Sequence, residues 1–123
     1  MIDFKNGVLF KLRQSDEYAD VVRQLLLPDE RVVGAFKAGR DGVVFTDRRV
    51  IAVNVQGLTG KKRDFTSLPY AKVAAFSVET AGTFDHDAEL ELHLPSLGAV
   101  RFEFAGQTNV VELARLIGAF ILV

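Results

Sequence analysis

Basic side chains occur in two short runs, and they are the residues of this chain best suited to bind an anion. Lys61, Lys62 and Arg63 follow a Gly-x-x-Gly turn, and Arg48 lies in the second run. A Walker A phosphate loop has four residues between its glycines and a Ser or Thr after its Lys, and this turn has neither feature. The glycines are typical of a hairpin, where Gly supplies a positive φ. These four cations are therefore candidate anion contacts through their charge alone.

Acidic and histidine side chains also gather once, in a run that resembles part of a cation site. Asp85, His86 and Asp87 are adjacent in the sequence. An EF-hand loop that began at Asp85 would need Gly at its sixth position and Glu at its twelfth, where this chain has Leu90 and Ser96. Zinc lacks a ligand set, because the chain has two histidines and no cysteine. We predict no metal and no other cofactor.

Nucleophilic and acid–base chemistry has no recognisable arrangement in this sequence. None of the serines lies in a Gly-x-Ser-x-Gly elbow. No motif pairs two carboxylates as general acid and general base, and the absence of cysteine removes the thiolate as a nucleophile. We therefore predict that the protein is not an enzyme.

Length and composition limit the classes of partner. A chain of 123 residues fits one domain with one core, and its formal net charge of -1 argues against nucleic acid and leaves only weak attraction to a membrane. The hydrophobic fraction of 49% is high for so small a domain, which predicts an interface between copies of the chain. No apolar run approaches the ~20 residues of a membrane span. The absence of cysteine fits a reducing compartment, so we expect a cytoplasmic protein.

The first 27 residues predict a hairpin followed by a short helix. Asn6-Gly7 favours a two-residue turn between strands at residues 2–4 and 8–12. Apolar residues recur at helical spacing over residues 16–26, after Ser15 as the N-cap, and the helix ends before Pro28.

Residues 30–105 predict a meander of seven strands. β-branched and aromatic residues dominate this region, and turn residues recur about every 8 to 12 positions. Apolar and polar residues alternate most clearly in the last two strands, which indicates one face toward the core and one toward solvent. The expected strands are residues 31–37, 42–46, 49–56, 62–69, 72–80, 88–94 and 100–104.

Residues 109–122 predict a helix that is apolar over most of its circumference. Asn109, with Glu112 three residues later, forms a start that is similar to a capping box. Because apolar residues occupy two faces, the helix must be covered on more than one side. The residues of the second face are candidate contacts between copies of the chain: Val111, Leu116, Ala119 and Leu122.

Four segments taken together resemble the bacterial pleckstrin-homology (PH-like) domain family. They are residues 44–51, 56–62, 67–70 and 76–85, with the sequences VFTDRRVI, QGLTGKK, SLPY and FSVETAGTFD. The resemblance covers residues 25–123. It implies a mainly β fold, namely a bent seven-stranded antiparallel barrel capped by the C-terminal helix, with an extra N-terminal segment. It also implies a self-assembling, ring-forming module to which no enzymatic activity attaches.

The same resemblance provides an expectation for each of two loops. Relatives that bind inositol phosphates use basic residues on the loop between the first two barrel strands, and here that loop has only Lys37 and Arg40, beside Asp41. Phosphoinositide recognition is therefore not expected. Residues 81–87 are the corner between two consecutive barrel strands, and we expect Phe84 to fill the inside of that corner.

These observations predict one domain, residues 1–123, composed of an N-terminal hairpin and helix extension (1–27), a barrel (30–105) and a capping helix (109–122). We expect a non-catalytic interaction module whose partner is itself, in a closed homo-oligomer, and which also has a protein partner that the sequence does not name. Two alternatives stay open. One is a peripheral membrane or anionic-ligand binder that uses the four cations, and the other is a peptide binder that adds a strand at a barrel edge.

Overall fold

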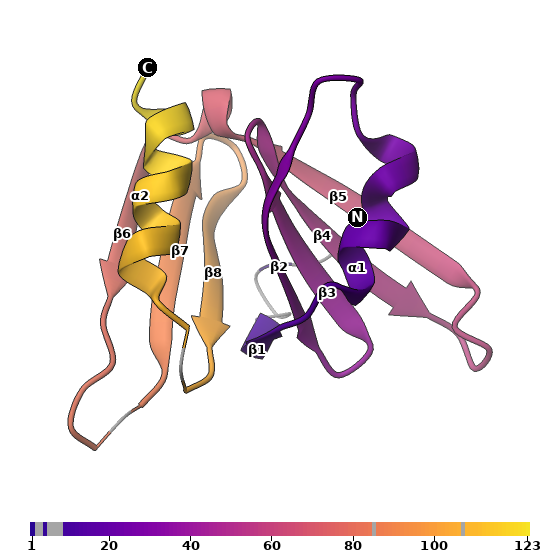
Figure 1. Ribbon diagram of the computed structural model, residues 1–123, viewed down its shortest axis with the longest axis horizontal. Helices are drawn as coiled ribbons and strands as arrows, with labels where there is room; N and C mark the ends of the chain where they lie inside the picture. The colour runs from indigo at the N-terminus through magenta and orange to yellow at the C-terminus, as the bar shows by residue number, and fades with distance from the viewer. Residues whose placement is uncertain (2–3, 5–8, 85, 107) are drawn as a thin grey trace.

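The computed structural model describes residues 1, 4, 9–84, 86–106 and 108–123, and it shows one curved sheet with helices on two sides (Figure 1). The helices are α1 (Glu17–Val21) and α2 (Val110–Ile121), with the 3-10 helices η1 (Val22–Leu25) and η2 (Tyr70–Lys72). The strands are β1 (Leu9–Gln14), β2 (Val32–Ala38), β3 (Asp41–Thr46), β4 (Arg49–Gln56), β5 (Lys62–Pro69), β6 (Ala75–Glu79), β7 (Ala88–Leu94) and β8 (Gly98–Phe104).

The sheet consists of two antiparallel meanders joined by the N-terminal strand. The eight strands have the order β5-β4-β3-β2-β1-β8-β7-β6. β1 pairs with β2 in the antiparallel sense and with β8 in the parallel sense, where Leu12 lies opposite Phe104. The sheet is open, because β5 and β6 stand at its two ends. The predicted PH-like fold is confirmed, although the seven-stranded barrel gains an eighth strand and one parallel pairing.

Most of the predicted strands are confirmed, and β4, β5 and β7 have the predicted bounds. The main correction concerns the strand predicted at residues 72–80, which begins only at Ala75. The chain first forms η2, in which Tyr70 is buried and donates a hydrogen bond from its hydroxyl to the Thr46 carbonyl at 2.7 Å. The predicted partner strand of the N-terminal hairpin, residues 2–4, lies outside the described residues apart from position 4.

The main core lies between the two meanders and under α2. Phe36 and Phe104 meet edge to face at 4.9 Å between ring centroids, and Phe45 and Phe102 do so at 5.8 Å. Leu12 of β1 is fully buried in the same cluster. Edge-to-face contacts are favourable arrangements for aromatic side chains, so these rings hold the two meanders together.

A second, smaller core covers the outer face of the first meander. Tyr18 and Val22, from α1 and η1, pack on Val44, Ile51 and Val53. The strands β3 and β4 are therefore buried on both faces, which explains their nearly continuous apolar sequences. The helix predicted at residues 16–26 is confirmed in its first part and continues as a 3-10 turn. Its N-cap residue is Asp16, one position after the predicted Ser15.

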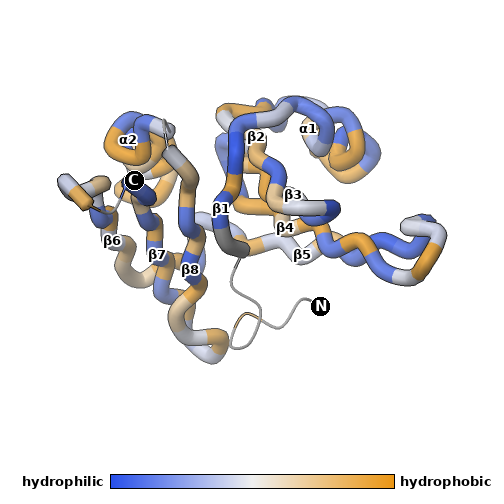
Figure 2. The backbone as a smooth tube through the Cα atoms, turned by 90° about the horizontal axis from the view of Figure 1, so that it is seen from below, coloured by the Kyte–Doolittle hydropathy of each residue, from blue (hydrophilic) through white to orange (hydrophobic). Residues whose placement is uncertain are grey.

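The C-terminal helix α2 lies over the second meander, as Figure 2 shows. It begins as predicted, with the side chain of Asn109 accepting a hydrogen bond from the Glu112 backbone N–H at 3.1 Å. Its inner face is buried on the core through Leu113 and Ile117, and Phe120 stacks on Tyr70. None of the helices in the described part of the chain is long and apolar enough to cross a membrane.

The loop between β6 and β7 differs from the predicted corner. Phe84 was expected to fill the inside of the turn, but its side chain is 98% exposed. The reason is that Phe84 lies in the loop beyond the last β6–β7 pair, Glu79 with Glu89, where residues 79–84 are all exposed and the core does not extend. The expectation for Phe84 is therefore wrong.

Candidate functional site

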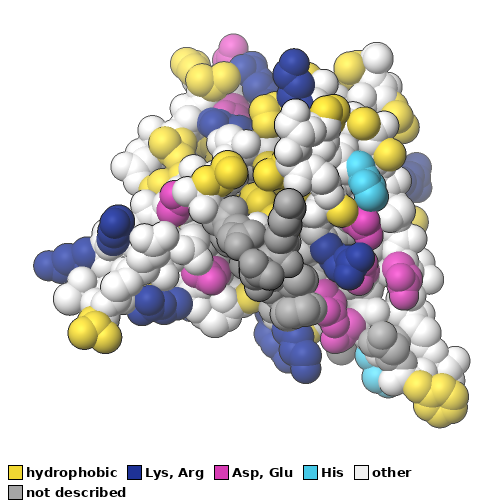
Figure 3. All heavy atoms as spheres, turned by 180° about the vertical axis from the view of Figure 1, so that it is seen from behind, with side chains coloured by type: hydrophobic (Ala, Val, Ile, Leu, Met, Phe, Trp, Pro, Cys, Tyr) yellow, Lys and Arg dark blue, Asp and Glu magenta, His cyan; other side chains and the backbone are white. Residues whose placement is uncertain are grey.

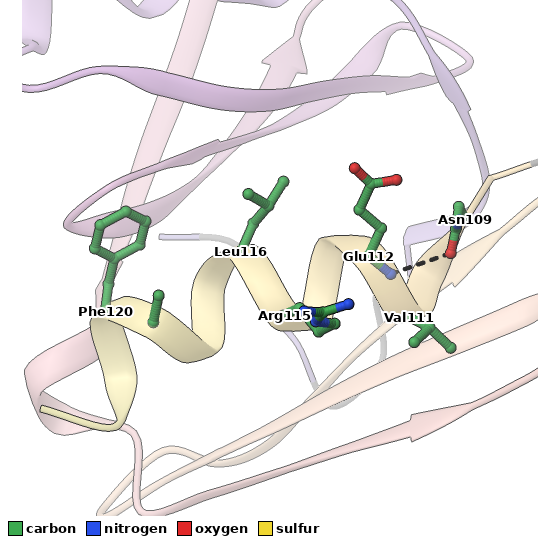
Figure 4. Close-up of a pocket in the computed structure, with 7 residues that line it drawn as sticks. Asn109, Val111, Glu112, Arg115, Leu116 and Phe120 are labelled. Carbon is green, nitrogen blue, oxygen red and sulfur yellow. Dashed lines mark hydrogen bonds between the residues drawn. The ribbon is translucent and has the colours of Figure 1, made fainter.

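The four residues predicted as contacts between copies lie on the exposed sides of α2 and at its C-cap, and we call this surface the outer α2 face: Val111, Leu116, Ala119 and Leu122. All four are exposed, and Leu122 is 75% exposed. The inner residues of the helix pack on the core, and these outer side chains remain partly or largely open to solvent. Figure 4 shows that Leu116 and Phe120 project from one side of α2, while Val111 and Arg115 project from another.

Two grooves run along this helix. The first, which we call the β6–α2 groove, has a volume of about 520 Å³ and lies between the helix and strand β6; its lining residues are Phe76, Val78, Val111, Ala114, Arg115, Gly118, Ala119 and Leu122. The second has a volume of about 530 Å³ and lies on the side of Leu116 and Phe120 (Figure 4). Both volumes fall within the range of roughly 300–1,000 Å³ that is usual for binding pockets.

Arg115 gives the β6–α2 groove its charge. It is the only charged residue among the described lining residues of this groove, and it also borders the second groove. Its side chain takes part in none of the hydrogen bonds or ion pairs found within the described part of the chain. An unpaired cation beside apolar side chains favours a ligand that brings both an apolar group and a negative charge.

Strand β6 borders the groove and is an unpaired edge of the sheet. Among the described strands it pairs only with β7. Exposed sheet edges are usually protected by proline, bulges or inward-pointing charges. β6 has regular pairing over its five residues, and its one charged residue is Glu79 at the end. The edge and the groove together form a continuous surface that is suited to contact another polypeptide.

The predicted anion contacts do not form one cluster. Lys61, Lys62 and Arg63 lie at the turn between β4 and β5, where the Arg40 guanidinium also donates a hydrogen bond to the Gly57 carbonyl at 2.8 Å. Arg48 lies beyond the opposite end of β4. The eight residues of that strand are separated by seven steps, which correspond to roughly 23 Å at about 3.3 Å per residue. Figure 3 shows basic side chains at the corner formed by the β4–β5 turn.

Arg49, which neighbours Arg48 in the sequence, is part of a buried ion pair. Its Nε and Nη2 groups donate to the two carboxylate oxygens of Glu30, both at 2.9 Å. Burial would raise the pKa of Glu30, but the hydrogen bonds from Arg49, Thr46 and the Leu27 N–H outweigh it and lower this pKa to about 2. No local sequence pattern indicates this pair, because the two residues are 19 positions apart. Its role is structural, since it joins the end of η1 to the sheet.

The described residues contain no arrangement of metal ligands. No group of three or more His, Cys, Asp and Glu side chains there is placed to hold a metal ion. His93 instead contacts Glu91 at 2.9 Å on the outer face of β7, and Arg101 contacts both Glu91 and Glu89. Ser67 accepts a hydrogen bond from Arg49 at 3.0 Å, so its hydroxyl has a structural role.

Two proteins of Bacillus subtilis (strain 168) are similar to this chain in sequence. The uncharacterized protein YjqA is 44% identical over 97 residues, which are 77% of this chain and 78% of that protein. The uncharacterized protein YozO is 31% identical over 107 residues, which are 87% of this chain and 90% of that protein.

Solved structures of pleckstrin-homology domains are similar to this chain in fold. A crystal structure of a protein with a pleckstrin-homology domain from Shewanella loihica PV-4 matches with a TM-score of 0.75 and 36% identity, over 94% of this chain and 99% of that one. A pleckstrin-homology domain from Shewanella amazonensis SB2B matches with a TM-score of 0.64 and 36% identity, over 96% and 94%. The model of the bacterial PH domain family matches residues 3–121. This chain therefore belongs to the bacterial PH domain family.

Proposed function

We propose that this protein is a non-catalytic interaction module that assembles with copies of itself into a closed homo-oligomer in the cytoplasm. The observation that supports the proposal is the outer α2 face, where Leu116 and Leu122 are exposed next to the unpaired edge of β6. An apolar face beside an open sheet edge is costly to leave in water and favours association.

The form of the assembly follows from the two ends of the sheet. β5 and β6 are different strands with different neighbours, so the molecule does not present two equivalent edges. A contact between unlike surfaces is heterologous, and it produces a ring when the rotation between copies closes. A closed ring leaves neither of the two contact surfaces unpaired, which is the reason to expect a discrete oligomer.

The test is the mass in solution, measured by sedimentation velocity over a dilution series. The wild-type protein should sediment as a single species several times heavier than the 13.6 kDa chain. Leu116→Glu and Leu122→Glu should shift the population toward the monomer, because each places a charge in an apolar contact. Leu58→Glu is the control, since Leu58 is also an exposed leucine but lies on the β4–β5 turn. A wild-type protein that is strictly monomeric at every concentration would refute the proposal.

A second candidate function is weak binding to an anionic membrane or ligand at the β4–β5 turn. Lys61, Lys62 and Arg63 follow the fully exposed Leu58 at this turn, and this combination of charge with an exposed apolar residue supports the candidate. Each basic residue near an anionic surface contributes about 1 kcal/mol, so binding should be weak and sensitive to salt. Flotation with anionic vesicles should be lost in K61E/K62E and kept in Arg48→Glu, which alters the opposite end of β4. Flotation that K61E/K62E leaves unchanged would count against the candidate.

A further inference from the structure

We propose that the β6–α2 groove receives the β6–β7 loop of a neighbouring copy, with Phe84 in the groove and Arg115 paired with the acidic residues that follow Phe84. This inference rests on the proposed self-assembly and specifies which two surfaces meet. The loop comprises residues 80–87, between the end of β6 and the start of β7.

The loop has the form of a ligand segment. Residues 79–84 are all exposed, and the Phe84 side chain is 98% exposed. The loop extends beyond the ends of β6 and β7 in Figure 1, and a hydrophobic side chain stands at its tip in Figure 3. Single exposed apolar residues are common on proteins. What distinguishes this one is that Asp85, His86 and Asp87 follow it directly in the sequence, so an apolar residue has two acidic residues within three positions of it.

The groove offers the complementary features. Phe76, Val78 and Leu122 provide apolar walls, and Arg115 provides the single charge. Gly118 lines the groove on the helix side. A glycine in the interior of a helix is destabilising relative to Ala, yet a Cβ at position 118 would lie 3.5 Å from the Phe76 ring, which is an ordinary contact. Packing within one chain therefore does not require glycine here, whereas a ligand side chain that enters the groove benefits from the missing side chain.

Charge selects Phe84 over Leu58, a fully exposed apolar residue of another loop. Leu58, on the β4–β5 turn, is as exposed as Phe84. It is followed by Lys61, Lys62 and Arg63, which would be repelled by Arg115 in the groove. The acidic residues after Phe84 would be attracted. The two tips thus differ in the sign of their charge, and only the β6–β7 loop matches the groove.

The loop and the groove lie at different places on one molecule, so their contact is heterologous. Each copy gives its loop to one neighbour and receives the loop of another, as a ring requires. Two other segments could occupy the groove, namely the loop of the same chain or a segment of a different protein. Neither would join copies of this chain, so a mass measurement separates both from the exchange of loops between copies.

The experiment compares Phe84→Ala with Leu58→Ala by sedimentation velocity over a dilution series. Both side chains are fully exposed, so neither change should alter the thermal melting of the isolated chain. Phe84→Ala should weaken self-association by about 10- to 100-fold, the range that corresponds to the burial of one aromatic side chain. Leu58→Ala should leave self-association unchanged.

The possible results separate the two proposals. If the wild-type protein assembles and Phe84→Ala assembles equally well, the loop–groove contact is wrong while self-assembly stands. If the wild-type protein is monomeric, self-assembly itself is wrong. If Phe84→Ala and Leu58→Ala weaken assembly to the same extent, the charge argument that selects the loop is overturned.

Charge reversal provides an independent test of the pairing. Arg115→Glu should weaken self-association, and so should the double substitution D85K/D87K. When Arg115→Glu is combined with D85K/D87K, the charges are complementary again and association should recover at least in part. The melting curves must match the wild type, because Asp87 also has an interaction within its own chain. Failure of the combined variant to recover, although each parent is folded and weakened, would contradict the pairing.

Discussion

Replacing Glu30 with Gln removes the negative charge from a buried network of hydrogen bonds that also includes Thr46 and Arg49. The Glu30 side chain is fully buried, and it accepts four hydrogen bonds. Two come from Arg49 at 2.9 Å, one from the Thr46 hydroxyl at 2.6 Å and one from the Leu27 N–H at 3.0 Å. Gln has one acceptor oxygen and one donor NH₂ group, so it cannot satisfy all these donors.

The magnitude follows from the burial of the pair. Breaking a buried ion pair by removing one partner costs about 3–5 kcal/mol, because the remaining charge is left uncompensated. Arg49 keeps its bonds to the Leu25 carbonyl and to Ser67, and 19% of its side chain is exposed. Both features reduce the cost of leaving its charge without Glu30. The expected loss for Glu30→Gln is therefore about 3 kcal/mol, the lower end of that range. The free energy of unfolding of a single domain is about 5–15 kcal/mol, so the loss is a large fraction of the total.

The assay is equilibrium unfolding in urea, with Asp20→Asn as the matched control. Asp20 also forms an ion pair, with Arg23 at 2.6 Å, but both side chains are about three-quarters exposed. Exposed pairs contribute about 0–1 kcal/mol, so Asp20→Asn should change the midpoint very little. A loss below about 1 kcal/mol for Glu30→Gln, within the range of an exposed pair, would refute the argument from burial.

The pH dependence of stability tests the same pair without a large structural change. The pKa of Glu30 is about 2 in the folded protein, against an ordinary value of 4.5. Because the folded pKa is the lower one, the stabilisation is complete above about pH 4.5 and is lost as the pH falls toward 2. Glu30→Gln should therefore reduce the slope of stability against pH in this window. An unchanged slope would contradict the assignment of the low pKa to Glu30.

Three further substitutions test the fold. Tyr70→Phe removes the buried hydrogen bond to the Thr46 carbonyl, and urea unfolding should show a loss of about 1–3 kcal/mol; a neutral result would mean that water replaces the hydroxyl. Gly42→Ala places a Cβ 2.4 Å from the Tyr18 ring and should cost about 1–3 kcal/mol, with lost protection of the α1 amides in hydrogen exchange; unchanged α1 amides would contradict this contact. Leu12→Ala leaves a cavity where β1 joins the two meanders and should cost about 2–5 kcal/mol; a loss below that range would show that β1 does not join them.

Local sequence patterns were sufficient for the elements whose contacts are close in the chain. The bounds of β4, β5 and β7 follow from runs of strand-forming residues between turns, and the start of α2 follows from its cap at Asn109. Burial of β3 and β4 on both faces was not predicted. It accounts for their continuous apolar runs, but its cause, the packing of Tyr18 on β3 and β4, is a contact between distant residues.

The features that sequence patterns did not reveal depend on contacts between distant residues. The parallel pairing of β1 with β8 joins Leu12 to Phe104, and no local pattern encodes such a register. The same holds for the Glu30–Arg49 pair and for the separation of Arg48 from Lys61 along β4. For the candidate site, the outer α2 face was found from helical periodicity, whereas the groove beside β6 needed the strand order.

The central claim is that this protein assembles with itself, and the mass of the wild-type protein in solution tests it most directly. Sedimentation velocity over a hundredfold dilution should show one discrete species several times heavier than 13.6 kDa. A single species of 13.6 kDa at every concentration would contradict the account.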